Sequence, residues 1–165
     1  PKVHSAHGDE RIDDYYWLRD DTRKDPEVIS YLEAENKYLE DWFASKGDSR
    51  QEIYDELVSL IPPHEVSMKI KYGDYLYFSE ISADQQYKTY YRELDGIKEL
   101  VLDVNVLAKG FEYFNVASLT PSSDNLLIAY AEDLSGRREY NIKVKDLASG
   151  KIIDSTIERS SGSVV

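Results

Sequence analysis

Three histidines and a surplus of carboxylates are the residues of this chain with the chemistry for acid–base catalysis or metal binding. A serine hydrolase needs a nucleophile on a tight turn, a histidine base and an acid that orients the base. The sequence contains no Gly-x-Ser-x-Gly motif for such a nucleophile, and its candidate bases are His4, His7 and His64. We therefore predict no catalytic residue within this chain.

Possible metal ligands gather near the start of the chain, at His4, His7, Asp9, Asp13 and Asp14. Arg11 and Arg19 lie among these acids and can pair with them instead. The spacing matches neither a His-Glu-x-x-His motif nor an EF-hand loop. The dipeptide Gly150-Lys151 lacks the Ser or Thr that a phosphate-binding loop requires after it. We predict neither a metal nor a cofactor.

A charged loop in the second half places Glu132-Asp133 and Arg137-Arg138 on either side of Ser135-Gly136. Two interpretations remain open: a loop that lines a channel or contacts a partner, and a solvated loop held by weak surface ion pairs. The 14 tyrosines are interpreted as packing area in half-buried strands, because an acidic chain is a poor stacking platform for nucleic acid.

Composition narrows the choice of partners. The 165 residues include 32 acidic and 20 basic side chains, a net charge of −12 that repels phosphate backbones and anionic lipid. We predict no nucleic acid and no membrane as partner. The chain has no cysteine, which favours a cytoplasmic location. It begins with Pro1 rather than Met, and residues 160–165 resemble a loop and the start of a further strand, so we expect both ends to be cut from a longer protein.

The pattern of residues 1–62 predicts an α-helical N-terminal extension. Asp25-Pro26-Glu27 is a strong helix start, with Asp as N-cap and Pro at the first helical position. Apolar residues then recur at helical spacing: Val28, Tyr31, Leu32, Tyr38, Leu39, Trp42 and Phe43. Asp48 is predicted to cap a second helix that ends before Pro62-Pro63.

Residues 63–165 change to short runs rich in Tyr and β-branched residues, separated by Gly and Asp turns. The predicted strands cover residues 65–70, 75–79, 87–94, 100–104, 111–119, 126–131, 139–145 and 152–154. Matching residues recur at an interval of about fifty residues, which is the period of a propeller blade. The pairs are Leu94 and Leu147, Gly96 and Gly150, and Asp103 and Asp154. We predict antiparallel β-sheet blades, about two of them, forming a partial β-propeller. A simple antiparallel meander is the alternative.

Residues 7–21, which read HGDERIDDYYWLRDD, resemble the N-terminal signature of the prolyl oligopeptidase family of serine peptidases. The sequence of residues 15–21 is closer to the oligopeptidase B (protease II) branch than to prolyl oligopeptidase itself. Residues 25–36 are similar to the first long helix of that branch, and residues 131–140 to its second-blade region.

The resemblance implies a larger protein with a helical extension, a seven-bladed propeller and an α/β-hydrolase domain. In that family the extension packs on the hydrolase domain, while the propeller covers the active site and excludes large folded proteins. Oligopeptidase B-like members cleave short peptides after Lys or Arg with a Ser-His-Asp triad, and acidic residues receive the basic side chain. No triad position falls within this chain, so no catalytic residue carries over.

The same resemblance implies that residues 16–20 anchor the extension structurally. Tyr16, Trp17 and Leu18 would bury aromatic and aliphatic area, while Asp13, Asp14, Arg19 and Asp20 would make polar contacts around them. The expected partners are the hydrolase domain, the remaining blades and short basic peptides. Two other functions remain open: a non-catalytic propeller module for protein interaction, and a prolyl oligopeptidase that cleaves after Pro.

Overall fold

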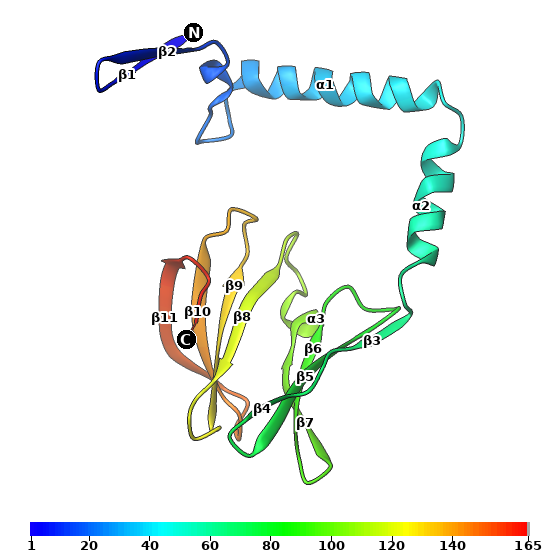
Figure 1. Cartoon of the computed structure of the whole chain (residues 1–165), viewed down its shortest axis with the longest axis vertical. Coiled ribbons are helices and arrows are strands. Elements are labelled where there is room, and N and C mark those ends of the chain that lie inside the picture. Colours follow the sequence, from blue (N-terminus) through cyan, green and yellow to red (C-terminus); the bar gives the residue numbers. More distant parts are fainter. Residues whose placement is uncertain (165) are drawn as a thin grey trace. The chain divides into compact units, whose positions relative to one another are not determined.

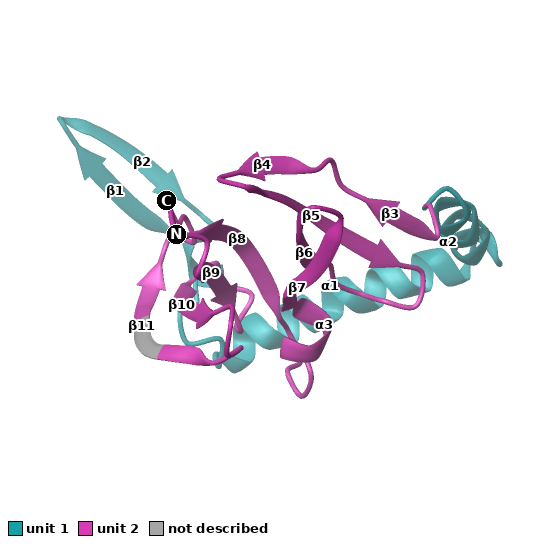
Figure 2. Cartoon of the chain, turned by 90° about the horizontal axis from the view of Figure 1, so that it is seen from below, with its two compact units in different colours: residues 1–61 teal, residues 62–165 magenta. Residues whose placement is uncertain are grey.

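The computed structural model describes residues 1–164, apart from the side chains of residues 154–156. The chain divides into two compact units, Pro1–Ile61 and Pro62–Val165, shown in teal and magenta in Figure 2. Of the helices in the described part of the chain, none combines the length and apolar character needed to cross a bilayer.

The first unit begins with a β-hairpin rather than a helix, which corrects the prediction that its whole length is helical. Strands β1 (Lys2–Ala6) and β2 (Asp9–Asp13) pair antiparallel. His7 and Gly8 connect them with φ values of 54° and 87°, the left-handed conformation that a tight two-residue hairpin turn requires. Few apolar residues lie in this hairpin, so its sequence carries little of the alternation that marks a strand.

Two helices follow, α1 (Pro26–Ala44) and α2 (Ser49–Ser59). The predicted start of α1 is confirmed, because the Asp25 side chain accepts a hydrogen bond of 2.9 Å from the Glu27 N–H. Asp48 precedes α2 as predicted, but its side chain makes no capping hydrogen bond. Val28 is the one buried apolar residue among the described residues of this unit.

The second unit starts with an antiparallel sheet, which we call blade 1 (Figure 1). Its strands are β3 (His64–Val66), β4 (Ile70–Tyr72), β5 (Tyr75–Ser82), β6 (Thr89–Leu94) and β7 (Ile97–Asp103). Both β3 and β4 pair with β5, so the single strand predicted at 65–70 is interrupted. At the break, the Ser67 hydroxyl accepts a hydrogen bond from the Ser79 N–H and replaces a backbone partner.

A short helix, α3 (Val104–Leu107), was not predicted and links blade 1 to the next sheet. Asp103 at the end of β7 caps it by accepting hydrogen bonds from the N–H groups of Asn105 and Val106. The side chain of Asp154, its counterpart in the repeat, lies outside the described part of the chain.

Blade 2 is a four-stranded antiparallel meander in the order β11-β10-β9-β8. Its strands are β8 (Asn115–Pro121), β9 (Leu127–Asp133), β10 (Tyr140–Asp146) and β11 (Ile152–Ser160). The strand runs and the fifty-residue repeat predicted two such blades, and the structure confirms this fold class. The last strand extends well beyond the predicted 152–154.

The core of the second unit lies between the two blades. Its fully buried cluster draws residues from both sheets and from the linking segment: Val101, Leu102, Val104, Phe114, Ile128 and Tyr130. Burying large aliphatic and aromatic side chains from two sheets is what holds neighbouring blades together. Residues of β9 alternate accordingly, with Ile128 and Tyr130 facing blade 1 and Ala129 and Ala131 on the other face.

Candidate functional site

Tyr16, the first residue of the predicted anchor, opens a single 3₁₀ turn between the hairpin and α1. The Lys2 ammonium lies 3.8 Å from the centroid of its ring, and the His4 ring contacts it edge-on with centroids 5.5 Å apart. Hydrogen bonding and the positive charge of Lys2 lower the pKa of the Tyr16 hydroxyl. The half-buried Tyr16 thus joins the hairpin to the turn that follows it.

Trp17 packs its ring edge-on against Tyr31 of α1, with centroids 5.2 Å apart. It nevertheless remains 42% exposed, and the neighbouring Leu18 is only half-buried. Within its own unit, the apolar part of the predicted anchor therefore keeps a substantial uncovered surface.

Asp20 organises the loop that leads into α1. One carboxylate oxygen accepts hydrogen bonds from the Thr22 N–H (2.9 Å) and hydroxyl (2.7 Å). The other accepts from the N–H groups of Lys24 and Asp25. These bonds, that from Asp25 foremost, lower the pKa of Asp20 to about 2. Arg19 instead pairs with Asp21 at 3.3 Å, so both polar residues of the predicted anchor are engaged locally.

The three histidines do not form a catalytic or metal centre among the described residues. His4 Nε2 lies 4.0 Å from an Asp13 carboxylate oxygen, His7 occupies the hairpin turn, and His64 is the exposed first residue of β3. In the described part of the chain, no three His, Asp or Glu side chains gather closely enough to hold a metal ion.

The loop between β9 and β10 is held by the carboxylate of Asp133 rather than by surface ion pairs. Asp133 is fully buried at the end of β9, where its Oδ1 accepts hydrogen bonds from the Ser135 N–H (2.8 Å), the Ser135 hydroxyl (2.9 Å) and the Gly136 N–H (3.1 Å). Its Oδ2 accepts a fourth from the Arg138 N–H at 2.9 Å. Burial raises the pKa of Asp133, but these hydrogen bonds outweigh it and the pKa lies below its usual value.

The other charges of this region are arranged differently. Glu132, also buried, forms an ion pair of 2.8 Å with Lys143 on the neighbouring strand. Arg137 and Arg138 are exposed, and neither takes part in an ion pair within the described residues. The buried Asp133 carboxylate therefore holds the backbone of the loop, while the side chains of Arg137 and Arg138 are exposed to solvent.

Asn125 joins the two blades at one end of their seam. This residue is 8% exposed and has a φ of 59°. Its side-chain carbonyl accepts a hydrogen bond of 2.9 Å from the Tyr77 hydroxyl, and its backbone carbonyl accepts one of 2.6 Å from Arg92. Gly73 lies so close that a Cβ atom there would fall 2.5 Å from the Asn125 amide nitrogen.

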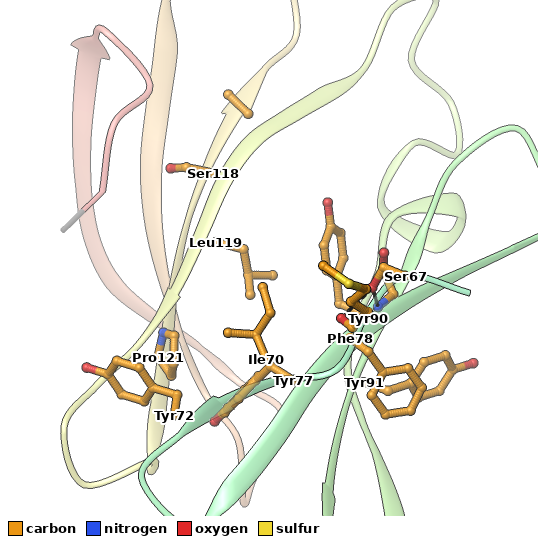
Figure 3. A pocket seen from close by; sticks show the side chains of 13 residues that line it. Ser67, Ile70, Tyr72, Tyr77, Phe78, Tyr90, Tyr91, Ser118, Leu119 and Pro121 are labelled. Atoms are coloured by element: carbon orange, nitrogen blue, oxygen red, sulfur yellow. Dashed lines mark hydrogen bonds between the residues drawn. The ribbon is translucent and has the colours of Figure 1, made fainter. Parts of the chain in front are cut away.

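A cavity of about 300 Å³ opens between the blades (Figure 3). Residues from β4, β5, β6 and β8 line it, chiefly aromatic and aliphatic, among them Ile70, Tyr72, Tyr77, Phe78, Leu119 and Pro121. Among the described residues that line this cavity, none has a carboxylate, an imidazole or a basic side chain, so these residues offer packing and shape rather than acid–base chemistry. The tyrosines around it pack between strands, in agreement with the packing interpretation.

Two antiparallel sheets, the five-stranded blade 1 and the four-stranded blade 2, share a core and repeat along the chain, and together they define a β-propeller module. Its charged groups order turns and seams, and a catalytic constellation is not present among its described residues. The whole chain, residues 1–165, matches the family model described as prolyl oligopeptidase, N-terminal beta-propeller domain. The chain therefore belongs to the prolyl oligopeptidase family.

Individual relatives agree with this assignment. The chain is 33% identical to dipeptidyl aminopeptidase BI of Pseudoxanthomonas mexicana over 99% of its length, and 34% identical to protease 2 of Moraxella lacunata over 95%. It covers 25% and 24% of those proteins, so it spans about a quarter of their length. The structure of oligopeptidase B from Leishmania major superposes with a TM-score of 0.86 at 28% identity, covering 99% of this chain and 26% of that one. Protease 2 and this structure support the oligopeptidase B branch.

Sequence reasoning missed Asp133 and Asn125 as organising residues. The run Asp133-Leu134-Ser135-Gly136 carries a detectable signal, because Asp followed two residues later by Ser is a common side-chain-capped turn. The inter-blade contacts of Asn125 reach Tyr77, 48 positions away, so no local pattern could reveal them.

Proposed function

We propose that this chain is the N-terminal and propeller portion of an oligopeptidase B-like serine endopeptidase of the cytoplasm. The full-length enzyme would hydrolyse short peptides after Lys or Arg. Residues 1–62 would pack on its α/β-hydrolase domain through the anchor at residues 16–20. Residues 63–165 would be the first blades of a propeller that admits short peptides and excludes large folded proteins.

The observation that carries the packing role is the uncovered apolar surface of the helices. Residues exposed by 39% or more include Tyr31, Leu32, Leu39 and Trp42 on α1 and Ile53, Leu57 and Val58 on α2. Monomeric proteins rarely leave so many large apolar side chains on one segment in contact with water. A domain that covers them supplies the burial that the helices lack.

Blade 2 supports the presence of further blades. Its face away from blade 1 carries Ile142 and Val144, which pair across the sheet with Ile157 and Ile153. The latter two are 63% and 41% exposed. On the same face the Thr120 hydroxyl donates a hydrogen bond of 2.8 Å to the Val164 carbonyl, so the segment after β11 runs along β8. Another blade packed here would bury this face.

The acidic balance supports basic peptides as substrates. A net charge of −12 raises the local concentration of cationic peptides near the protein, and added salt screens this attraction. We expect kcat/KM of the full-length enzyme for Arg-containing peptides to fall as ionic strength rises. The kcat/KM for an uncharged peptide should change little in the same titration.

The test compares three matched fluorogenic peptides that carry Arg, Lys or Pro before the cleaved bond and are otherwise identical. We expect the full-length protein to cleave the Arg and Lys peptides and to be inhibited by a serine-directed covalent reagent. It should cleave a basic ten-residue peptide but not the same sequence displayed in a loop of a folded protein.

Other outcomes of this comparison identify the alternatives. Preference for the Pro peptide would assign prolyl oligopeptidase activity. Absence of cleavage of all three peptides by a folded full-length protein would favour the non-catalytic interaction module, and the proposed function would then be wrong.

A further inference from the structure

The chain contains two pairs of adjacent basic residues, Arg23-Lys24 and Arg137-Arg138. All four side chains are exposed and belong to loops. Exposed loops are where proteolytic nicking concentrates, and basic pairs offer a peptidase specific for Arg or Lys two adjacent bonds. Both pairs are thus positions where such an enzyme would be expected to cut.

The Arg137-Arg138 loop is closed by Asp133. Three hydrogen bonds to Oδ1 hold Ser135 and Gly136, and the bond from the Arg138 N–H to Oδ2 fastens the far side of the loop. Gly136 also rests on the ring of Tyr113, where a Cβ atom would lie 3.7 Å from the ring carbons. The basic pair therefore sits on a loop tied to a buried group rather than on a free segment.

The backbone conformation of this loop differs from the extended conformation in which a substrate binds to a peptidase active site. Arg138 has a φ of 59°, and Gly136 has a φ of 73°. Peptides that are read by their main chain bind in an extended conformation, which needs negative φ values. Cleavage on either side of Arg138 thus requires the loop to open, and opening breaks the bond between Arg138 and Asp133.

The other basic pair shows the same arrangement on an unrelated segment. Asp20 accepts hydrogen bonds from Thr22, Lys24 and Asp25, and Arg23 has a φ of 54°. In each loop one residue of the basic pair is left-handed and one donates its N–H to the closing carboxylate. The first loop precedes a helix and the second connects two strands, so the shared feature is not a consequence of one local fold.

We propose that Asp133, and Asp20 at the other loop, keep the two basic pairs closed to peptidases that cleave after Arg or Lys. The peptidases concerned are those whose active site admits a folded protein, such as trypsin, because under the function proposed above the propeller would exclude a folded copy of the same enzyme. The closure itself does not depend on that function, because trypsin meets the same loop. A failed trypsin test would therefore leave the proposed function standing. A failure of the proposed function would likewise leave the closure of the loops standing.

The experiment is limited digestion of the folded full-length protein by trypsin, with new termini quantified by mass spectrometry. Asp133→Asn retains Oδ1 for Ser135 and Gly136 but turns an amide N–H₂ toward the Arg138 N–H. We expect cuts after Arg137 and Arg138 to appear at least tenfold faster than in the unaltered protein. Tenfold corresponds to about 1.4 kcal/mol of opening free energy.

Two further variants separate loop opening from general loosening. Asp146→Asn alters another strand-end carboxylate, which accepts hydrogen bonds from Ser149, and should leave cleavage at Arg137 and Arg138 unchanged. Ser135→Ala removes the hydroxyl that donates to Asp133 and accepts from the Arg137 N–H, and it should accelerate cleavage by a few fold. It also serves as the measurement if Asp133→Asn does not fold.

The proposal is overturned by either of two results. The first is cleavage of the unaltered protein at Arg137 and Arg138 as fast as that of the Asp133 and Ser135 variants. The second is an equal acceleration at all basic sites in these variants, which would report unfolding of the whole unit.

Discussion

The two units of this chain are stabilised in opposite ways. Residues 62–165 enclose a core with Val101 and Ile128 fully buried, whereas residues 1–61 bury a single apolar side chain, Val28. Both units are rich in large apolar residues. The first places most of them on helix surfaces, while the second sandwiches many of them between two sheets.

This difference shows where each unit obtains its stability. A meander pair generates an interior because each sheet offers a face to its neighbour. A hairpin followed by separate helical segments does not, since a helix can bury only the stripe that another element covers. The second unit is therefore expected to be sensitive to substitutions in its own core, and the first to whatever covers it in the full-length protein.

The largest expected effect lies in the blade core. Ile128→Ala removes a fully buried side chain between the blades and should lower the free energy of unfolding by about 2–5 kcal/mol. Denaturant titration of the full-length protein measures this loss. The control is Ile97→Ala, at a blade position that is 67% exposed, which should change stability by about 0.5 kcal/mol or less. Equal effects of the two substitutions would contradict the described core.

Trp17→Ala tests the first unit. If another domain covers the anchor, as proposed, we expect a loss of about 2 kcal/mol or more in the full-length protein together with reduced peptidase activity. Trp17→Phe, which keeps an aromatic ring against Tyr31, should lose less. A Trp17→Ala protein of unchanged stability and activity would show that the 42% exposed ring stays in water.

Asn125→Ala examines the seam that makes the two blades one unit. It removes the acceptor for the Tyr77 hydroxyl and places Ala at a φ of 59°, so we expect a loss of about 1–3 kcal/mol. Asn125→Gly relieves the backbone part and isolates the hydrogen bond. A double-mutant cycle with Tyr77→Phe should show coupling; strictly additive losses would mean that the bond contributes nothing.

The smallest expected effect is the acid response of the Asp20 loop. Because folding lowers the pKa of Asp20 from 3.8 to about 2, its stabilisation is complete above the unfolded value and is lost as pH falls toward 2. The stability difference between the unaltered protein and Asp20→Asn should therefore be constant above about pH 4 and shrink below it. A difference that persists unchanged to pH 2 would refute the described hydrogen bonds.

Local patterns predicted the elements whose determinants are local. The start of α1 follows from Asp25-Pro26-Glu27, where the cap, the fixed φ of proline and an acidic first turn act within three residues. The later strands follow from alternation and Gly turns, and the repeat of about fifty residues revealed the blades. The hairpin β1–β2 was missed because five-residue strands of mostly polar residues carry no such alternation.

The roles of the polar residues that order loops and strands depend instead on tertiary contacts. Glu132 and Asp133 are neighbours of the same charge type, and in sequence they look alike. In the structure Glu132 faces Lys143 across the sheet, and Asp133 turns to the other side and ties the following loop. Adjacent residues of a strand point to opposite faces, so their roles depend on what each face meets.

The sequence by itself thus determined the family resemblance, the helical start at Asp25, the strand runs and the blade repeat, because each depends on residues close together in the chain or on a recurring pattern. Only the tertiary structure decided which apolar residues are buried, which carboxylates close loops, and how Asn125 joins two blades. Those features arise from contacts across tens of residues, which exist only after the strands have packed.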